Sequence, residues 1–241
     1  MKENIYSSEF VEGLFNRMSN SYERMNYFTS FGFSLRWRRQ FLKFLVPSVE
    51  RVKIIDLMTG MGETWGAAKR RYPNSELTAL DISDGMLNRA RIKNQKKFEG
   101  SVKIEKQDIL KNKLPSNYFD IAICAFGLKT FTHSQIEKIA EETYRILKPG
   151  GQISFIEVSN PSNRILSLLY SIHLGFVVPV IGFLFLGGPE EYKMLWRYTS
   201  AFGSSKEAFS SFQNQGFILE YKSYFFGCAT GFTGKKPKSF S

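Results

Sequence analysis

The stretch IIDLMTGMGET, residues 54 to 64, combines an acidic side chain with two glycines where an apolar run meets a helical pattern. Gly60 and Gly62 would let the backbone approach a bound molecule closely, because glycine has no Cβ. Asp56 is expected to hold the loop and the cationic amino end of that molecule through charge-assisted hydrogen bonds. The simpler alternative is that the two glycines only make a tight turn.

A dinucleotide site is the main competing interpretation of this loop. The pattern G-x-G-x-x-G, begun at Gly60, requires glycine at position 65, but the chain has Trp65 there. The tryptophan side chain would crowd a pyrophosphate. The loop therefore favours a different cofactor.

Two aspartates follow apolar runs further along the chain. Asp81 ends the run ELTALDI, where a carboxylate can accept both hydroxyl groups of a ribose. Asp108 is placed to accept from an adenine amino group, with Ile109 packing on the ring. Taken singly, Asp81 could be an acid at a helix N-terminus and Asp108 a turn aspartate. Together with the loop, they offer what the amino end, the sugar and the base of an adenosine-containing cofactor require.

The elements that position these residues alternate along the chain. Strand-like apolar runs begin at residues 52, 76, 102, 119 and 152, and helical patterns separate most of them. This alternation predicts a mostly parallel sheet with helices on both faces. Apolar residues at helical spacing from 136 to 147 predict a covering helix that stops at Pro149 and Gly150. A capped helix from Ser204 or Ser205 and an antiparallel strand pair are expected to follow.

The whole chain, 1–241, is expected to form a single domain. Its parts are an N-terminal helical cap over the top edge of the sheet (1–47), a cofactor-binding core (48–160), an apolar acceptor cap (161–200), and a C-terminal helix with a strand pair (201–241). Residues 165–188 contain no Asp, Glu, Lys or Arg, but glycines and Pro179 interrupt them. We expect this segment to line an acceptor pocket or touch a bilayer surface. Plain core and a membrane span are the alternatives.

Composition restricts the partners. The formal net charge is +11, but the basic residues are scattered and no nucleic-acid motif accompanies them, so no nucleic-acid partner is expected. Attraction to an anionic membrane surface is favoured instead. Cys124 and Cys228 lie in apolar runs, which predicts neither a disulfide framework nor a metal site. The N-terminus lacks the apolar core of a secretory signal, so we expect a cytoplasmic protein. The sequence is also compatible with peripheral membrane contact and with a homodimer.

Longer stretches resemble a known family. The glycine loop, FDIAICAFGL and ETYRILKPGG are similar to class I methyltransferases. The lead segment NRMSNSYERMNYFTSFGFSLRWRR and the later LDISDGML, AFGLKTFT and EYKMLWRYTSAF resemble the ubiquinone/menaquinone C-methyltransferase family nearly end to end. The resemblance implies a Rossmann-like fold with seven strands, the last one antiparallel, and S-adenosylmethionine as cofactor. It also implies cofactor contacts at Gly60, Met61, Gly62, Asp81, Asp108, Ile109 and Ala125. We add Ile82, which is next to Asp81 in the sequence, to these expected contacts.

Departures from the family pattern gather on the acceptor side. Lys129 and Thr130 replace the Arg-Asn that members carry after FGL, and Phe232 stands where histidine is usual. Tyr22 and Glu23 replace Tyr-Asp. On the cofactor side, Met58 stands where most class I enzymes have glycine. This distribution favours an altered acceptor.

For methylation of a hydroquinone-like ring carbon, the enzyme must align that carbon with the sulfonium methyl and remove a phenolic proton. The candidates are Tyr22 as hydrogen-bonding partner or relay, Lys129 as the cation that stabilises a phenolate, and Glu23 and His133 as bases. The simpler interpretations are helix packing for Tyr22, a solvated loop charge for Lys129 and a helix start for His133.

The sequence leaves three functions open. The first is C-methylation of a quinone precursor. The second is O- or N-methylation of another lipophilic natural product or lipid, which the changes at Lys129, Thr130 and Phe232 favour. The third is a non-catalytic S-adenosylmethionine-binding subunit of a biosynthetic complex.

Overall fold

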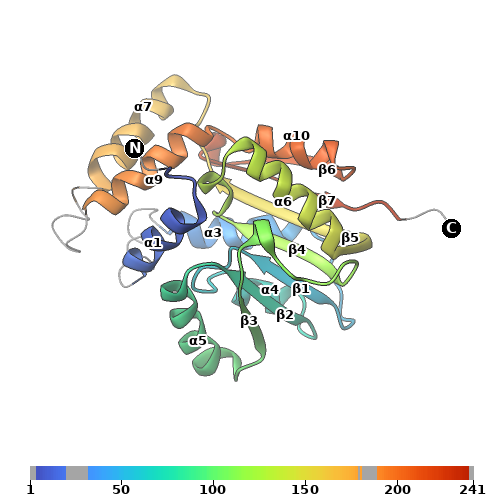
Figure 1. Ribbon diagram of the computed structural model, residues 1–241. Coiled ribbons are helices and arrows are strands. Elements are labelled where there is room, and N and C mark those ends of the chain that lie inside the picture. Colours follow the sequence, from blue (N-terminus) through green and yellow to red (C-terminus); the bar gives the residue numbers. More distant parts are fainter. Residues whose placement is uncertain (1–3, 20–31, 179, 181–188, 239–241) are drawn as a thin grey trace.

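The computed structural model describes residues 4–19, 32–178, 180 and 189–238. In this part of the chain, seven strands form one central sheet in the order β3-β2-β1-β4-β5-β7-β6 (Figure 1). The strands are β1 Lys53–Leu57, β2 Glu76–Asp81, β3 Val102–Lys106, β4 Phe119–Ala125, β5 Leu147–Val158, β6 Ile218–Tyr224 and β7 Ala229–Lys235. β1 to β5 are parallel, and β7 runs antiparallel to both of its neighbours. The expected Rossmann-like methyltransferase fold is confirmed.

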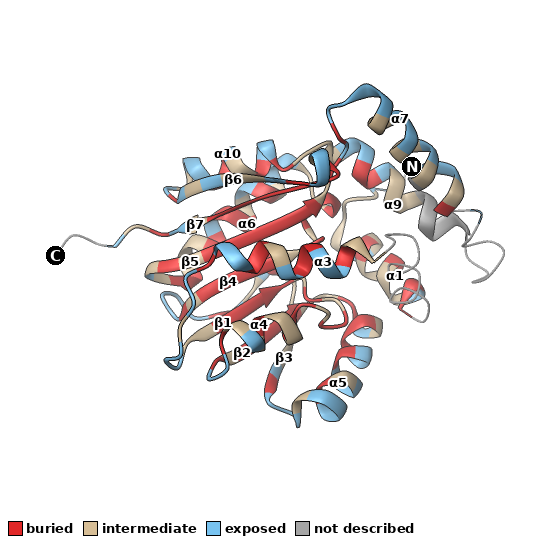
Figure 2. Cartoon of the chain, turned by 180° about the vertical axis from the view of Figure 1, so that it is seen from behind, coloured by how far each residue is buried: buried red, intermediate tan, exposed pale blue. Residues whose placement is uncertain are grey.

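Helices cover both faces of the sheet (Figures 1 and 2). One face packs against α6 His133–Ile146 and α10 Lys206–Asn214. The other packs against α3 Phe33–Gln40, the 3-10 helix η1 Phe41–Phe44, α4 Trp65–Arg71 and α5 Asp84–Phe98. Three further 3-10 turns are η2 Ile109–Lys111, η3 Leu128–Thr130 and η5 Phe225–Gly227.

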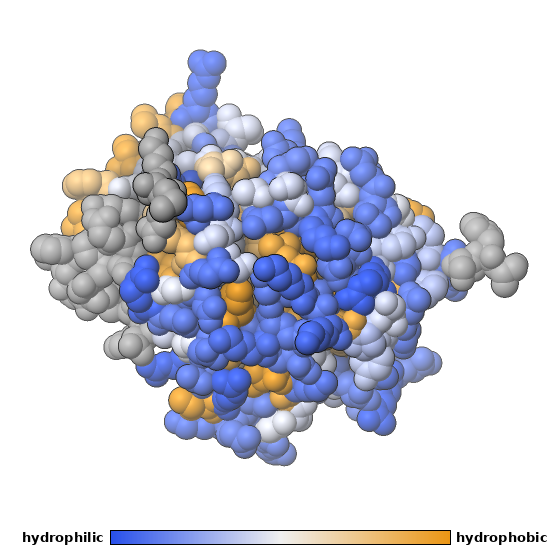
Figure 3. All heavy atoms as spheres, viewed as in Figure 1, coloured by the Kyte–Doolittle hydropathy of each residue, from blue (hydrophilic) through white to orange (hydrophobic). Residues whose placement is uncertain are grey.

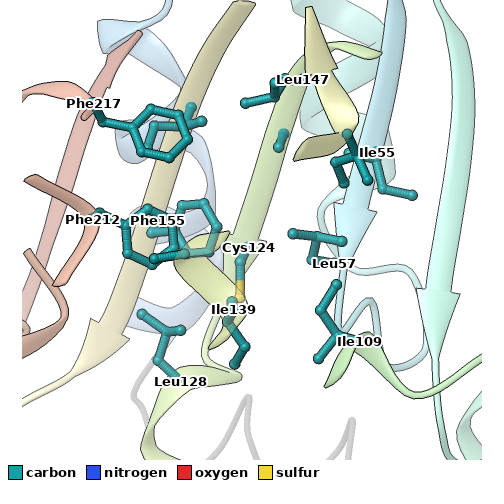
Figure 4. Packing of buried hydrophobic residues seen from close by; sticks show 14 of the residues in the cluster. Ile55, Leu57, Ile109, Cys124, Leu128, Ile139, Leu147, Phe155, Phe212 and Phe217 are labelled. Carbon is teal, nitrogen blue, oxygen red and sulfur yellow. The ribbon is translucent and has the colours of Figure 1, made fainter. Parts of the chain in front are cut away.

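The apolar runs of the central strands are buried because helices lie on both sides of them. On the α6 face, Ile55 of β1 and Cys124 of β4 belong to one cluster with Ile139 of α6 and Phe212 of α10 (Figure 4). Full burial of such a side chain stabilises the fold by about 1.5 to 3 kcal/mol. This core fixes the strand ends, and with them the loops that follow.

The boundary between α6 and β5 differs from the prediction. α6 ends at Ile146, before the Pro149–Gly150 stop that the sequence predicted. Leu147 already pairs with Phe119 of β4, so strand pairing begins before the turn residues are reached. The register then shifts across a bend in which Gly150 takes φ 80°.

A cap lies at the carboxyl ends of the parallel strands (Figure 1). It contains α1 Ser8–Met18, α7 Arg164–Ile172, the π-helix η4 His173–Val177 and α9 Pro189–Phe202. The sequence predicted that residues 1–47 lie over this edge. α1 does so, whereas α3 and η1 pack on a face of the sheet, where Ser154 donates a hydrogen bond to the Phe41 carbonyl.

The described part of the apolar segment 165–188 is not plain core. α7 has no buried residue, and Ile165, Leu168 and Leu169 are exposed. Figure 3 shows hydrophobic residues gathered where α7 lies, at the upper left. The opposite side of α7 packs through Leu166 and Tyr170 against the core beneath. Among the described residues, no helix combines the length and apolar character needed to cross a bilayer.

Candidate active site

A pocket lies at the carboxyl ends of β1, β2 and β4, with α1 contributing to its wall. Its lining consists of Tyr6, Ser8, Val11, Phe15, Arg38, Met58, Thr59, Gly60, Glu63, Leu80, Asp81, Ile82, Met86, Gln107, Asp108, Ile109, Ala125, Phe126, Gly127, Thr130 and Phe131. The carboxyl ends of neighbouring parallel strands meet at one edge, so residues far apart in sequence converge here. The pocket therefore has both polar and apolar walls.

The glycine loop is held from beneath by a chain of hydrogen bonds. The Trp65 indole donates to Thr59 Oγ1 at 2.8 Å, and that hydroxyl donates to Asp56 Oδ2 at 2.6 Å. Trp65 and Asp56 are both buried, and neither lines the pocket. A Cβ on Gly62 would come within 2.5 Å of the Trp65 ring, so glycine is required there by packing as well as by its φ of 74°. The tryptophan thus shapes the loop without entering the pocket.

Of the two glycines of the loop, only Gly60 lines the pocket. Its φ is 58°, a conformation that glycine adopts without strain. Met61 instead packs with Leu14 of α1 and Tyr198 of α9. Met58 lines the pocket at a φ of 54°. The predicted contacts at Met61 and Gly62 therefore lie behind the lining and support it.

Asp81 connects the loop to the start of α5. Its Oδ2 accepts from the Gly60 amide at 2.8 Å, and its Oδ1 accepts from the Ser83 amide at 2.9 Å. Burial raises the pKa of Asp81, although these backbone donors act in the opposite direction. Carboxylate oxygens accept more than one hydrogen bond, so Asp81 could also accept from ribose hydroxyls. Ile82 lines the pocket beside it.

Asp108 lies at the neighbouring strand end and is tied to α1. Its Oδ2 accepts from Ser8 Oγ at 2.6 Å, and its Oδ1 accepts from the Leu110 amide at 2.9 Å. Ile109 is buried and lines the pocket next to it, and Ala125 lines it at the end of β4. A flat ring could lie against Ile109 with an amino group directed at Asp108. The structure therefore brings Gly60, Asp81, Ile82, Asp108, Ile109 and Ala125 together.

Two charged residues in the pocket wall were not singled out from the sequence. Arg38 of α3 and Glu63 of the loop have side chains only 6% and 8% exposed, with Nη2 and Oε1 3.9 Å apart. The Arg38 guanidinium lies 4.7 Å from the centre of the Phe126 ring. Glu63 was visible within the glycine loop, but nothing in the sequence near Arg38 distinguishes it from Arg36 or Arg39.

The environment of Asp56 strongly perturbs its carboxyl group. Burial, together with the charge of Glu63, raises its pKa from the ordinary 3.8 to about 7. The hydrogen bond from Thr59 and the charge of Arg38 act in the opposite direction. Asp56 therefore titrates near neutral pH beneath the loop.

Neither Lys129 nor His133, the two described candidates for acceptor chemistry, lines the pocket. Lys129 is buried, and its Nζ donates to Glu157 Oε1 at 2.8 Å and to the Phe126 carbonyl at 2.9 Å. It is therefore not the solvated loop charge that was one interpretation. His133 begins α6 with its side chain 58% exposed, near Glu137 and Glu207. Tyr22 and Glu23 lie outside the described residues.

Phe232 shows that one departure from the family pattern belongs to the core. It is buried and stacks on Phe155 with ring centres 5.3 Å apart. It does not line the pocket. Thr130 does line it, and its hydroxyl donates to the Gly127 carbonyl at 2.9 Å. Within the described residues, no cluster of His, Cys, Asp or Glu could hold a metal ion, and Cys124 and Cys228 are free thiols.

Solved structures share this fold. A S-adenosylmethionine-dependent methyltransferase from Thermotoga maritima matches with a TM-score of 0.65 at 19% identity, covering 93% of this chain and 99% of that one. One from Aquifex aeolicus matches with a TM-score of 0.56 at 17% identity, covering 83% and 88%. The fold is that of class I S-adenosylmethionine-dependent methyltransferases.

Sequence comparison identifies the family within this class of methyltransferases. The model of the ubiE/COQ5 methyltransferase family matches residues 2–236. A demethylmenaquinone methyltransferase of Thermus thermophilus is 30% identical over 224 residues, 93% of this chain and 100% of that protein. One of Staphylococcus aureus (strain JH9) is 30% identical over 240 residues, 99% and 98%. The chain belongs to the ubiE/COQ5 methyltransferase family, and so it uses S-adenosylmethionine to methylate a small-molecule acceptor.

Proposed function

We propose that the protein methylates a ring carbon of a quinone-type precursor that carries a lipophilic tail. The observation that carries this proposal is the 30% identity, along nearly the full length of both chains, to proteins named as demethylmenaquinone methyltransferases. The apolar wall of the pocket supports it, because Phe15, Met58 and Phe131 would surround an aromatic ring and exclude water.

The residues at the strand ends fit the cofactor. Asp108 and Ile109 would hold the adenine, Asp81 the ribose hydroxyls, and Gly60 would give the cofactor close access to the backbone. Glu63 Oε1 is buried without a hydrogen-bond partner among the described residues, so the site has an acceptor available for a ligand donor. When bound, S-adenosylmethionine supplies an electrophilic methyl group on a positively charged sulfur.

On the acceptor side, the contribution of the described residues is positioning and exclusion of water. The ring carbon gains the methyl group and loses its hydrogen as a proton, and alignment of such a displacement supplies several kcal/mol of the barrier reduction, about 7 to 11 in well-oriented cases. Phe126, Gly127 and Thr130 form one wall, and the Lys129–Glu157 pair would hold that wall in place. We propose Glu23 as the base that receives the phenolic proton, with Tyr22 as a hydrogen-bonding partner or relay. His133 is not preferred, because its side chain is 58% exposed and does not line the pocket.

The test is product analysis with a reduced naphthoquinone that has an open ring position and an isoprenoid tail. With S-adenosylmethionine carrying a deuterated methyl group, we expect a product that keeps both phenolic hydroxyls and loses one ring hydrogen. Mass spectrometry before and after acetylation counts the hydroxyls. A product with only one remaining hydroxyl, or no product in the presence of bound cofactor, would contradict the proposal.

O-methylation of another lipophilic phenol is the second candidate. It is favoured by one observation: the loop after Phe126 presents Thr130, with its hydroxyl turned to the Gly127 carbonyl, and no cation to the pocket. This loop therefore provides no cation to stabilise the phenolate form that methylation of a ring carbon requires. The hydroxyl count in the same assay separates the two candidates.

A further inference from the structure

The pocket wall contains a charged pair that the fold does not fully satisfy. Glu63 has a side chain only 8% exposed, and its Oε1 has no hydrogen-bond partner among the described residues. Its nearest cation, Arg38, is 3.9 Å away, beyond hydrogen-bond distance. A buried carboxylate oxygen without a donor is costly, typically by about 1 to 3 kcal/mol or more for a charged group. Such an atom, when it lines a pocket, indicates a missing ligand donor.

The position of the pair follows from the order of residues along the pocket. Asp81 accepts from the Gly60 amide at 2.8 Å, and Glu63 Oε2 lies 3.5 Å from the place where a Cβ on Gly60 would be. The strand order β3-β2-β1-β4 places the end of β4 next to the loop after β1, and the Arg38 guanidinium lies 4.7 Å from the centre of the ring of Phe126, which follows β4. Starting from Asp108, the sequence of sites is therefore base, ribose, loop and then this pair. The amino-acid end of S-adenosylmethionine lies beyond its ribose in the same order.

The charges also match that end of the molecule. Asp56, Glu63 and Asp81 are three acidic groups around the loop, and Arg38 is the one cation among the described lining residues. The amino-acid end carries one carboxylate and one ammonium beside a positively charged sulfur. A zwitterion can satisfy both members of the pair, whereas a phenolate acceptor would satisfy Arg38 and leave Glu63 buried without a donor.

We propose that Arg38 and Glu63 bind the amino-acid end of S-adenosylmethionine, with the Arg38 guanidinium on its carboxylate and the Glu63 carboxylate on its ammonium. The inference rests on the cofactor of the family and is independent of which acceptor is methylated. Arg38 provides a planar set of donors that suits a carboxylate. α3, far from the glycine loop in sequence, thus becomes part of the cofactor site.

The experiment is calorimetric titration of matched ligand pairs into the full chain. S-adenosylmethionine and its decarboxylated analogue share the sulfonium and differ in the carboxylate. S-adenosylhomocysteine and methylthioadenosine share the thioether and differ in the whole amino-acid end. The variants are Arg38→Met, Glu63→Gln and the double variant, which removes both charges together. Arg39→Met is the matched control, because Arg39 is exposed on the same helix and does not line the pocket.

For Arg38→Met we expect about tenfold to a hundredfold weaker binding of S-adenosylmethionine, and a change below about threefold for the decarboxylated analogue. For Glu63→Gln we expect a similar loss for S-adenosylhomocysteine and little change for methylthioadenosine. Arg39→Met should leave all four affinities unchanged. Each comparison is made within one variant, so a partial loss of folded protein affects both ligands equally.

Two results would overturn the proposal. Equal losses for the complete and truncated ligands would mean that the pair only supports the fold. Unchanged affinity for S-adenosylmethionine together with a raised KM for the acceptor would assign Arg38 and Glu63 to the acceptor instead. The first result does not depend on whether the quinone acceptor is correct, because the titrations contain no acceptor. The second is measured with whichever acceptor the enzyme methylates.

Discussion

The Ser8 hydroxyl donates a 2.6 Å hydrogen bond to the Asp108 carboxylate and so ties α1 to the strand edge that the sequence associated with adenine. Two further hydrogen bonds also hold α1 against the strand edge. Asn16 of α1 accepts from the Ser83 hydroxyl at 2.7 Å and from the Gly85 amide at 2.8 Å. The N-terminal helix is therefore held by the loops that would hold the cofactor.

Ser8→Ala should loosen α1. Losing a hydrogen bond to a charged group costs about 1.5 to 3 kcal/mol, so amide hydrogen exchange in residues 8–18 should rise about tenfold or more. Mass spectrometry of peptides covering α1 measures this. Ser210→Ala, an exposed serine on α10, is the control and should leave α1 unchanged. Unaltered exchange in the Ser8 variant would mean that Asn16 and its partners hold α1 without Ser8.

Asp81→Ala should weaken binding of S-adenosylmethionine by more than about tenfold, because a charge-assisted contact is worth about 1.5 to 3 kcal/mol. The loop would also lose the acceptor for the Gly60 amide. Calorimetry measures the affinity. Asp84→Ala is the matched control, since that side chain is 52% exposed and does not line the pocket. Equal affinity in wild type and the Asp81 variant would refute the assignment.

Asp56 should make the folded protein less stable as pH rises toward neutrality. Its pKa is raised in the folded state from 3.8 to about 7, so between these values the folded state binds the extra proton. The free energy of unfolding therefore falls between these two pH values and falls no further above about pH 7. Asp56 accounts for at most roughly 4 kcal/mol of this decrease. Burial is the main cause of this raised pKa; the charges of Glu63 and Asp81 add to it, and Arg38 and the Thr59 hydroxyl reduce it.

Asp56→Asn is the variant that isolates this effect. Asparagine is neutral at every pH and can still accept from the Thr59 hydroxyl, so the difference in stability between the variant and wild type should grow from pH 5 to pH 8. Urea unfolding at several pH values measures the difference. A difference that does not change with pH would show that Asp56 is already ionised at pH 5.

Lys129→Met should destabilise the fold by about 3 to 5 kcal/mol, because it leaves the Glu157 carboxylate buried without its cation. The double variant Lys129→Met with Glu157→Gln should recover most of this loss. Urea unfolding compares the two. If Lys129 supports the loop, the recovered double variant should also recover much of the turnover. A stable but inactive double variant would instead support a catalytic role for Lys129.

The sequence by itself determined the fold and much of the cofactor edge. Asp81 and Asp108 each follow an apolar run, and in a parallel sheet the carboxyl ends of neighbouring strands lie side by side, so their convergence could be predicted. Gly60 could be predicted because only a glycine readily takes its backbone conformation beside a ligand. These inferences depend on local pattern and chain order, which are present in the sequence.

The tertiary structure alone decided which charged side chains enter the pocket. Arg38 lines it while the adjacent Arg39 is exposed, because the rotation of α3 against the sheet selects one face of the helix. Lys129 is directed to Glu157, on a strand 28 residues later, and leaves the pocket to Thr130. The direction and burial of a charge depend on contacts between distant segments, and no spacing of residues along the chain records them.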